Sequence, residues 1–148
     1  VIGLFEGSIE KIVALAALMP IVAGIGGNSG NQTTTMIVRG LALGQISLHN
    51  MKALIKKELG VSLLNGILWG GVLGLIAYLL YGNYQLGLVM MAAMTINLLV
   101  AAVMGVIIPL VMTKFGHDPA VGSSVLITAV TDSGGFFIFL GLATIFLL

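Results

Sequence analysis

Long apolar stretches separated by short polar segments dominate the chain. They run from about Lys11 to Gly40, Val61 to Leu80, Gln85 to Met112, and Pro119 to the end. None of them alternates strictly between apolar and polar residues, as a half-buried strand would. A helix needs about 20 apolar residues to cross the hydrocarbon core, whereas a barrel strand needs only about 10. The pattern therefore predicts four membrane-spanning helices.

Two segments lie outside these predicted spans. Val1–Phe5 resembles the end of an earlier apolar run, so we expect the chain to be a piece of a longer protein or a natural short form. Leu43–Leu59 interleaves polar and apolar residues and closes with Lys56, Lys57 and Glu58. Such a segment is typical of a short amphipathic helix lying at the membrane interface. A solvated loop is the alternative.

Composition agrees with a membrane protein. Of 148 residues, 59% are hydrophobic and only 7% are charged, with a mean hydropathy of +1.18. Soluble domains carry about 25% charged residues. The net charge of +1 argues against a nucleic-acid surface, and the lack of cysteine excludes disulfides and thiolate metal sites. We expect an all-α polytopic bundle that forms one domain over residues 1–148 in the inner (plasma) membrane.

Basic residues predict the orientation of this bundle. The connection before Val61 holds Arg39 and three lysines, and the connection before Pro119 holds Lys114. The connection Tyr81–Gln85 holds no basic residue. Because loops rich in Lys and Arg stay in the cytoplasm, we expect the first and third connections there and Tyr81–Gln85 outside.

Asp132 is the only acidic residue that the predicted spans place deep in the membrane. Asp118 and Pro119 form a typical helix start, which would put Asp132 about 21 Å along the last span. No Lys or Arg lies deep in a predicted span to neutralise it. The carboxylate therefore needs water, a cation or a proton. The alternative to a cation site is a protonated Asp132 bonded to a neighbouring helix.

Two polar faces surround this acid in the predicted arrangement. Ser124, Thr128 and Asp132 are four residues apart, so they form one stripe on a helix. Asn28 and Asn31 share a face of the first span. These groups offer only oxygen ligands, which suit Mg²⁺ or Ca²⁺, and a single carboxylate suits a cation that keeps its waters. The alternative is that the hydroxyls bond back to their own helix.

Two long motifs resemble the MgtE family of magnesium channels. PIVAGIGGNSGNQ at Pro20–Gln32, followed by RGLA at Arg39–Ala42, resembles the second transmembrane helix of that family. DPA at Asp118–Ala120, followed by TAVTDSG at Thr128–Gly134, resembles the fifth. The resemblance covers nearly the whole chain. It implies a subunit of five helices that works as a homodimer, with the pore at or near the subunit interface.

The resemblance also implies roles for single residues. The ion-selecting carboxylate falls on Asp132, the pore-lining positions before it fall on Thr128 and Ser124, and the asparagine motif falls on Asn28 and Asn31. Members of the family often carry Asn where Ser124 stands, which removes one amide from the expected pore. By the same resemblance, we expect most of the first helix and the cytosolic magnesium-sensing domains of the family to lie outside this sequence.

We therefore expect Mg²⁺ or another divalent cation to cross the membrane through a pore lined by the first and last complete spans. The expected metal ligands are Asp132 and Thr128, and the expected partners are the bilayer and a second copy of the chain. An enzyme is not expected, since an intramembrane aspartyl protease needs two deep aspartates. The alternatives are a secondary transporter for another cation and a non-conducting membrane fragment.

Overall fold

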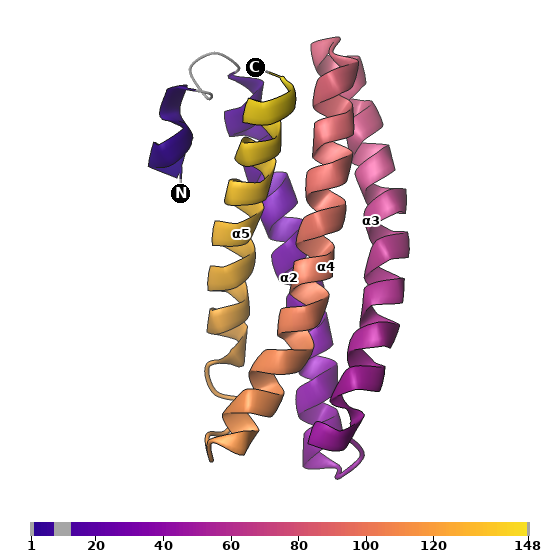
Figure 1. Cartoon of the computed structure of the whole chain (residues 1–148), viewed down its shortest axis with the longest axis vertical. Helices are drawn as coiled ribbons and strands as arrows, with labels where there is room; N and C mark the ends of the chain where they lie inside the picture. Colours follow the sequence, from indigo (N-terminus) through magenta and orange to yellow (C-terminus); the bar gives the residue numbers. More distant parts are fainter. Residues whose placement is uncertain (1, 8–12, 148) are drawn as a thin grey trace.

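The structure of the chain is a computed structural model that describes residues 2–7 and 13–147. Its elements are helical, and no strand occurs within those residues. They are the 3₁₀ helices η1 (Ile2–Phe5) and η2 (Leu48–Asn50) and the α-helices α2 (Ala14–Ala42), α3 (Met51–Tyr81), α4 (Tyr84–Lys114) and α5 (Ser123–Phe146) (Figure 1). The predicted all-α fold is confirmed.

Length and composition make three of these helices, α3, α4 and α5, apolar enough to cross a membrane, as judged on the described residues. Helix α2 has a similar length, 29 residues, but its middle carries the polar stretch from Asn28 to Thr35. Its predicted start at Lys11 lies outside the described residues. The bundle is therefore a multi-pass membrane fold in which α2 is the most polar helix.

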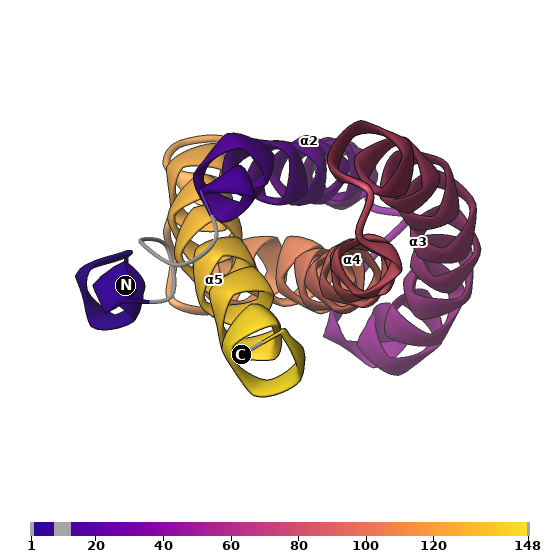
Figure 2. The same cartoon turned by 90° about the horizontal axis from the view of Figure 1, so that it is seen from above.

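Helix α4 lies at the centre of the bundle and contacts the other three long helices. Helices α2 and α5 pack against each other and against α4, while α3 lies against the outer side of α4 (Figure 2). The short helix η1 lies beside α5, where the ring of Phe5 meets that of Phe137 edge to face at 5.9 Å. This arrangement brings the two helices with the predicted polar stripes together.

The hairpin between α3 and α4 follows from two residues. Gly82 ends α3 in a left-handed conformation with φ 66°, which glycine adopts without a steric penalty. The side-chain oxygen of Asn83 accepts hydrogen bonds from the backbone N–H groups of Gln85 and Leu86, at 3.0 and 3.3 Å. Asn83 thereby caps α4. The predicted connection Tyr81–Gln85 is thus a tight turn between antiparallel helices.

Two hydrophobic clusters hold the bundle together. The larger one joins α2, α3, α4 and α5, and Met90, Met94 and Phe139 are among its fully buried members. The smaller one consists of Ile37, Val106 and Leu110, with partly buried Leu41, Ile46, Met51, Leu54 and Ile55 packed around it. The buried methionines of α4 therefore act as packing residues.

The amphipathic segment Leu43–Leu59 is not an interfacial helix, so that prediction is wrong. From Met51 onward it forms the first turns of α3, which continues to Tyr81. Its apolar residues Leu54 and Ile55 pack against the smaller hydrophobic cluster. Because this face is buried against the bundle, α3 begins ten residues before the predicted start at Val61.

Helix α5 begins at Ser123, four residues after the predicted start at Pro119. Gly122, with φ 93°, precedes it. The carboxylate of Asp118 instead caps a turn by accepting a hydrogen bond from the backbone N–H of Ala120 at 3.0 Å. Asp132 therefore stands about 13.5 Å along α5, rather than about 21 Å.

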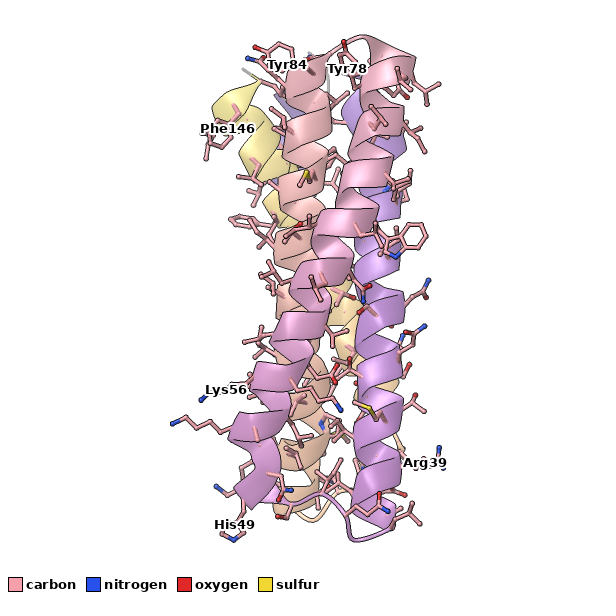
Figure 3. The ribbon with its side chains drawn as sticks, turned by 90° about the vertical axis from the view of Figure 1, so that its right-hand side faces the viewer. Arg39, His49, Lys56, Tyr78, Tyr84 and Phe146 are labelled. Atoms are coloured by element: carbon pink, nitrogen blue, oxygen red, sulfur yellow. The ribbon has the colours of Figure 1, made fainter. Side chains whose placement is uncertain are left out.

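Charged and aromatic residues mark opposite ends of the bundle (Figure 3). Arg39, His49 and Lys56 lie at one end, while Tyr78, Tyr84 and Phe146 lie at the other. The basic connections therefore share one end, as their charge pattern requires. Which end faces the cytoplasm stays a prediction.

Candidate functional site

The polar stretch of α2 folds as an uninterrupted helix with two different sides. Gly26, Gly30 and Thr34 are buried against the other helices, whereas Asn28 and Gln32 are exposed. Small residues let α4 and α5 approach closely on the buried side. The amides consequently point away from the core, in the middle of a helix as long as its membrane-spanning neighbours.

A hydrogen bond joins this stretch to α5. The hydroxyl of Ser124 donates to the side-chain oxygen of Asn31 at 3.0 Å. The glycines of α2 permit this approach, because a Cβ on Gly30 would lie 2.7 Å from Cγ2 of Ile127. A pocket of about 490 Å³ lies on the same side, and Asn28, Asn31, Gln32 and Thr35 line it. The two predicted polar stripes therefore meet.

Asp132 lies half-buried on α5, near the level of Asn28 on α2. Its neighbour Thr131 has its hydroxyl 3.3 Å from the place that a Cβ on Gly27 would occupy, which fixes that level. Within the described parts of the chain, no basic side chain pairs with Asp132 and no three acidic or histidine side chains gather into a metal cluster. The chain therefore supplies a single carboxylate here.

The hydroxyls around Asp132 divide into two kinds. Thr131 is fully buried and donates to the backbone carbonyl of Ile127 at 2.8 Å, so it bonds back to its own helix. Ser124 and Thr128 are exposed, as their shared helical stripe requires. Ser124 and Thr128 of the predicted stripe are thus exposed, and so is Ser133 beside Asp132.

The sequence interpretation missed Asn97 on α4. Its side chain is fully buried, and its amide nitrogen donates to the backbone carbonyl of Val22 at 3.1 Å. Its side-chain oxygen has no partner among the described residues. Gly26 and Gly135 leave room for the amide. The one signal was a lone amide in an otherwise apolar span.

Glu58 is a second acid inside the bundle, buried near its basic end, directly after exposed Lys56 and Lys57. Glu58 is 8% exposed and accepts a hydrogen bond from the hydroxyl of buried Thr33 at 3.2 Å. The sequence interpretation had placed it in the interfacial segment. The signal was available in Ser62 and Asn65, which follow Glu58 at the helical spacings of four and seven residues.

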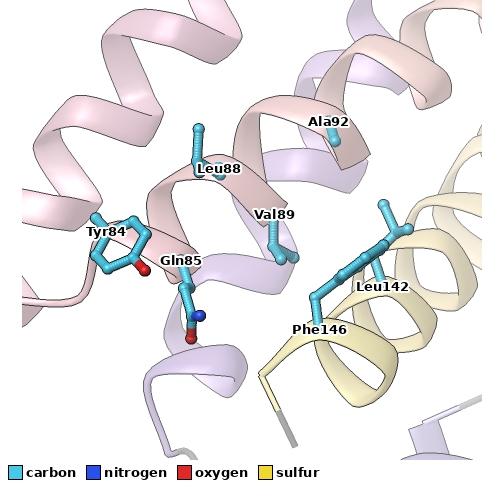
Figure 4. A pocket seen from close by; sticks show the side chains of 7 residues that line it. All are labelled: Tyr84, Gln85, Leu88, Val89, Ala92, Leu142 and Phe146. Atoms are coloured by element: carbon cyan, nitrogen blue, oxygen red, sulfur yellow. The ribbon is translucent and has the colours of Figure 1, made fainter.

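Another pocket, of about 380 Å³, lies between α4 and α5 near Tyr84 (Figure 4). Apart from Gln85 and the Tyr84 hydroxyl, its walls are apolar. They are Leu88, Val89, Ala92, Leu142 and Phe146. This lining holds no charged side chain, and its mostly apolar walls suit hydrocarbon.

The chain is similar to three curated magnesium transporters over nearly its whole length. The chain is 32% identical over 147 residues to "Magnesium transporter MgtE" of Bacillus subtilis (strain 168), covering 99% of this chain and 33% of that protein. It is 32% identical to the protein of that name from Thermus thermophilus, covering 97% and 32%. It is 33% identical to "Magnesium transporter MgtE" of Enterococcus faecalis, covering 97% of this chain and 32% of that protein.

The chain thus spans about a third of the length of these curated relatives. The matched part includes all four long helices. Residues 19–142 also match the family described as "Divalent cation transporter", a range that contains Asn28, Asn31, Ser124, Thr128 and Asp132. This chain belongs to the MgtE family of divalent cation transporters.

Proposed function

We propose that the chain carries Mg²⁺ across the plasma membrane along the polar face that α2 and α5 share. The family consists of transporters rather than enzymes, and the relatives compared above are magnesium transporters. The observation that carries the proposal is the hydrogen bond between Ser124 and Asn31. It joins two polar stripes that would otherwise be isolated in the membrane.

The chemistry of this face suits a hydrated ion. Mg²⁺ dehydrates reluctantly and keeps several waters. The side-chain oxygens of Asn28, Asn31 and Thr128 accept hydrogen bonds from such waters, while Asp132 supplies the negative charge. These oxygens are too few to replace the whole hydration shell, so binding through water is favoured.

A second copy of the chain would complete the path. The exposed polar side chains of Asn28 and Thr128 are unfavourable in contact with lipid. Pairing these faces in a homodimer would cover them and bring a second Asp132 to the path. Two carboxylates then attract one divalent cation more strongly than one does. An inside-negative membrane potential favours entry of that divalent cation by about 4.6 kcal/mol per 100 mV, twice the free energy for a single charge.

Two other functions remain to be separated from this one. A secondary transporter for another cation needs a coupling ion, and transporters of that kind often contain inverted repeats. A non-conducting piece of a longer transporter would fold without passing ions. Flux in the absence of any coupling ion excludes both alternatives.

The test is Mg²⁺ entry into liposomes that contain the purified chain and a Mg²⁺-sensitive dye. With no Na⁺ or proton gradient, we expect Mg²⁺ entry to rise with an inside-negative potential. Asp132→Asn should reduce entry by about tenfold or more. Asp118→Asn is the matched control, because Asp118 is an exposed acid before the same helix and Asn also caps turns.

Equal entry through Asp132→Asn and the original chain would contradict the proposed path. Absence of entry in every sample, with folded protein in the liposomes, would favour the non-conducting piece. Entry that requires Na⁺ or a proton gradient would favour the secondary transporter.

A further inference from the structure

Glu58 is a buried acidic residue that has no role in the proposed path along α2 and α5. Its carboxylate is more than nine-tenths buried and lies about 10.5 Å along α3. The hydroxyl of Thr33 donates to it, but no basic side chain pairs with it within the described residues. A nearby cation would stabilise a buried carboxylate of this kind.

A polar stripe continues from Glu58 along α3. Ser62, Asn65 and Trp69 follow it at spacings of four, three and four residues, so all four residues share one face of the helix. Ser62 is 3% exposed, and Thr33 fixes the direction of this face toward α2. The stripe is therefore buried at Glu58 and Ser62 and reaches the surface of the bundle at Trp69, which is 51% exposed.

A cleft opens between α2 and α3 at the level of Asn65. Its volume is about 420 Å³, and its lining is Ile25, Asn28, Ser29, Gln32, Asn65, Trp69 and Leu98. Six waters around Mg²⁺ occupy about 180 Å³, at about 30 Å³ each. The cleft is thus large enough for a fully hydrated divalent cation.

The surroundings of the cleft determine how an ion reaches it. Toward the basic end of the bundle, Leu54 and Ile55 on the turns before Glu58 pack into the smaller hydrophobic cluster. On its other flank, Asn28 and Gln32 also line the pocket on the proposed conduction face. The cleft therefore adjoins the proposed conduction face at Asn28 and Gln32. Leu54 and Ile55 close it toward the basic end of the bundle.

We propose that the cleft between α2 and α3 is a second cation site, which holds a hydrated divalent cation. The side-chain oxygens of Gln32 and Asn65 accept hydrogen bonds from its waters. Glu58 lies outside the lining, about 10.5 Å from Asn65 along α3, and adds negative charge at longer range. The proposal rests on the proposed function only for the choice of a divalent cation. Binding in the cleft does not require Asp132.

Trp69 gives this site its own reporter, because it is the single tryptophan of the chain and lines the cleft. Mn²⁺ is a paramagnetic divalent cation that quenches tryptophan fluorescence at short range. We expect Mn²⁺ to quench Trp69 saturably in the full chain held in lipid nanodiscs, and we expect Mg²⁺ to reverse the quenching by competition.

Substitutions in and near the cleft test whether the quenching arises from an ion bound there. Glu58→Gln keeps an acceptor for Thr33 but removes the charge, and Asn65→Leu removes an amide from the wall. Each should weaken Mn²⁺ quenching by about tenfold or more. Asp132→Asn should leave it unchanged, and Glu6→Gln, which changes an exposed acid outside the bundle, is the matched control.

Several results would overturn the second site. One is the absence of saturable quenching in the original chain, as expected if lipid or a second copy fills the cleft. Another is quenching that Asp132→Asn abolishes and Glu58→Gln preserves. A third is unchanged quenching in both Glu58→Gln and Asn65→Leu. Loss of Mg²⁺ flux with intact quenching would instead refute only the proposed conduction path.

Discussion

The contact between α3 and α4 and the contact between α2 and α5 both use glycine, but to different effect. A Cβ on Gly74 would lie 2.6 Å from the carbonyl oxygen of Gly87, so backbone meets backbone there. On α2, a Cβ on Gly27 or Gly30 would instead meet side-chain atoms of α5. Side chains change rotamer and backbones in helices do not. The α3–α4 contact is therefore rigid at Gly74. The α2–α5 contact is more adjustable at Gly27 and Gly30 than at Gly135, where a Cβ would lie 3.1 Å from the Cα of Ala23.

Adding one methyl group to α3 tests whether its contact with α4 is rigid, and we expect the largest effect from this change. Gly74→Ala places a Cβ against a backbone that has no freedom to move, and we expect it to lower the free energy of unfolding by about 1–3 kcal/mol. Gly71→Ala is the matched control, because a Cβ there meets nothing within 4 Å. That control should raise stability by up to ~1 kcal/mol through helix propensity.

Thermal melts in one detergent compare these two variants directly. Equal stabilities for Gly74→Ala and Gly71→Ala would mean that α3 and α4 do not touch as closely as described. The rigid scaffold, and with it the contrast to the α2–α5 contact, would then have to be abandoned.

A smaller effect is expected where α2 meets Asn97. Gly26→Ala puts a methyl group where the Asn97 amide lies, so the amide must turn away and lose its bond to the carbonyl of Val22. We expect a loss of about 1 kcal/mol. Asn97→Ala removes the obstacle, so the double variant should be more stable than the sum of the single changes predicts. Strict additivity would show that the two positions do not touch.

The smallest expected effect concerns the hydrogen bond between α2 and α5 and its role in Mg²⁺ entry. Asn31→Leu breaks the bond from Ser124 but suits a helix in lipid, so stability should change little. We expect Mg²⁺ entry to fall by about threefold, equivalent to ~0.6 kcal/mol in the barrier. Gln85→Leu, which removes an exposed amide at the far end of α4, serves as the control. Unchanged entry in folded Asn31→Leu would make this amide a packing group only.

Much of the fold could be predicted from the sequence, because long apolar runs and the turn residues Gly82 and Asn83 between two of them are local signals. Helix starts were less predictable. Asp118-Pro119 has the residues of a helix start, yet Asp118 caps a turn instead, with Gly122 setting the boundary. Likewise Leu43–Leu59 has an amphipathic pattern, but its apolar face packs on Ile37 and Val106 rather than on lipid.

The candidate site could be predicted only in part for a related reason. Asn31 and Ser124 stood out because they belong to polar clusters, and the structure places them in contact. Asn97 and Glu58 did not stand out, because burial depends on partners distant in the sequence. Asn97 is 75 residues from Val22, and Glu58 is 25 residues from Thr33. Helical periodicity within one segment does not reveal such pairs.

The central claim is that the carboxylate of Asp132 binds the transported ion. Its most direct test is a titration of Mg²⁺ into purified Asp132→Asn and the original chain, with thermal melts of both. The account predicts that Asp132→Asn binds Mg²⁺ about tenfold more weakly or worse, with equal or higher stability because a desolvated charge is gone. Unaltered Mg²⁺ affinity together with reduced stability would contradict it and make Asp132 a structural residue.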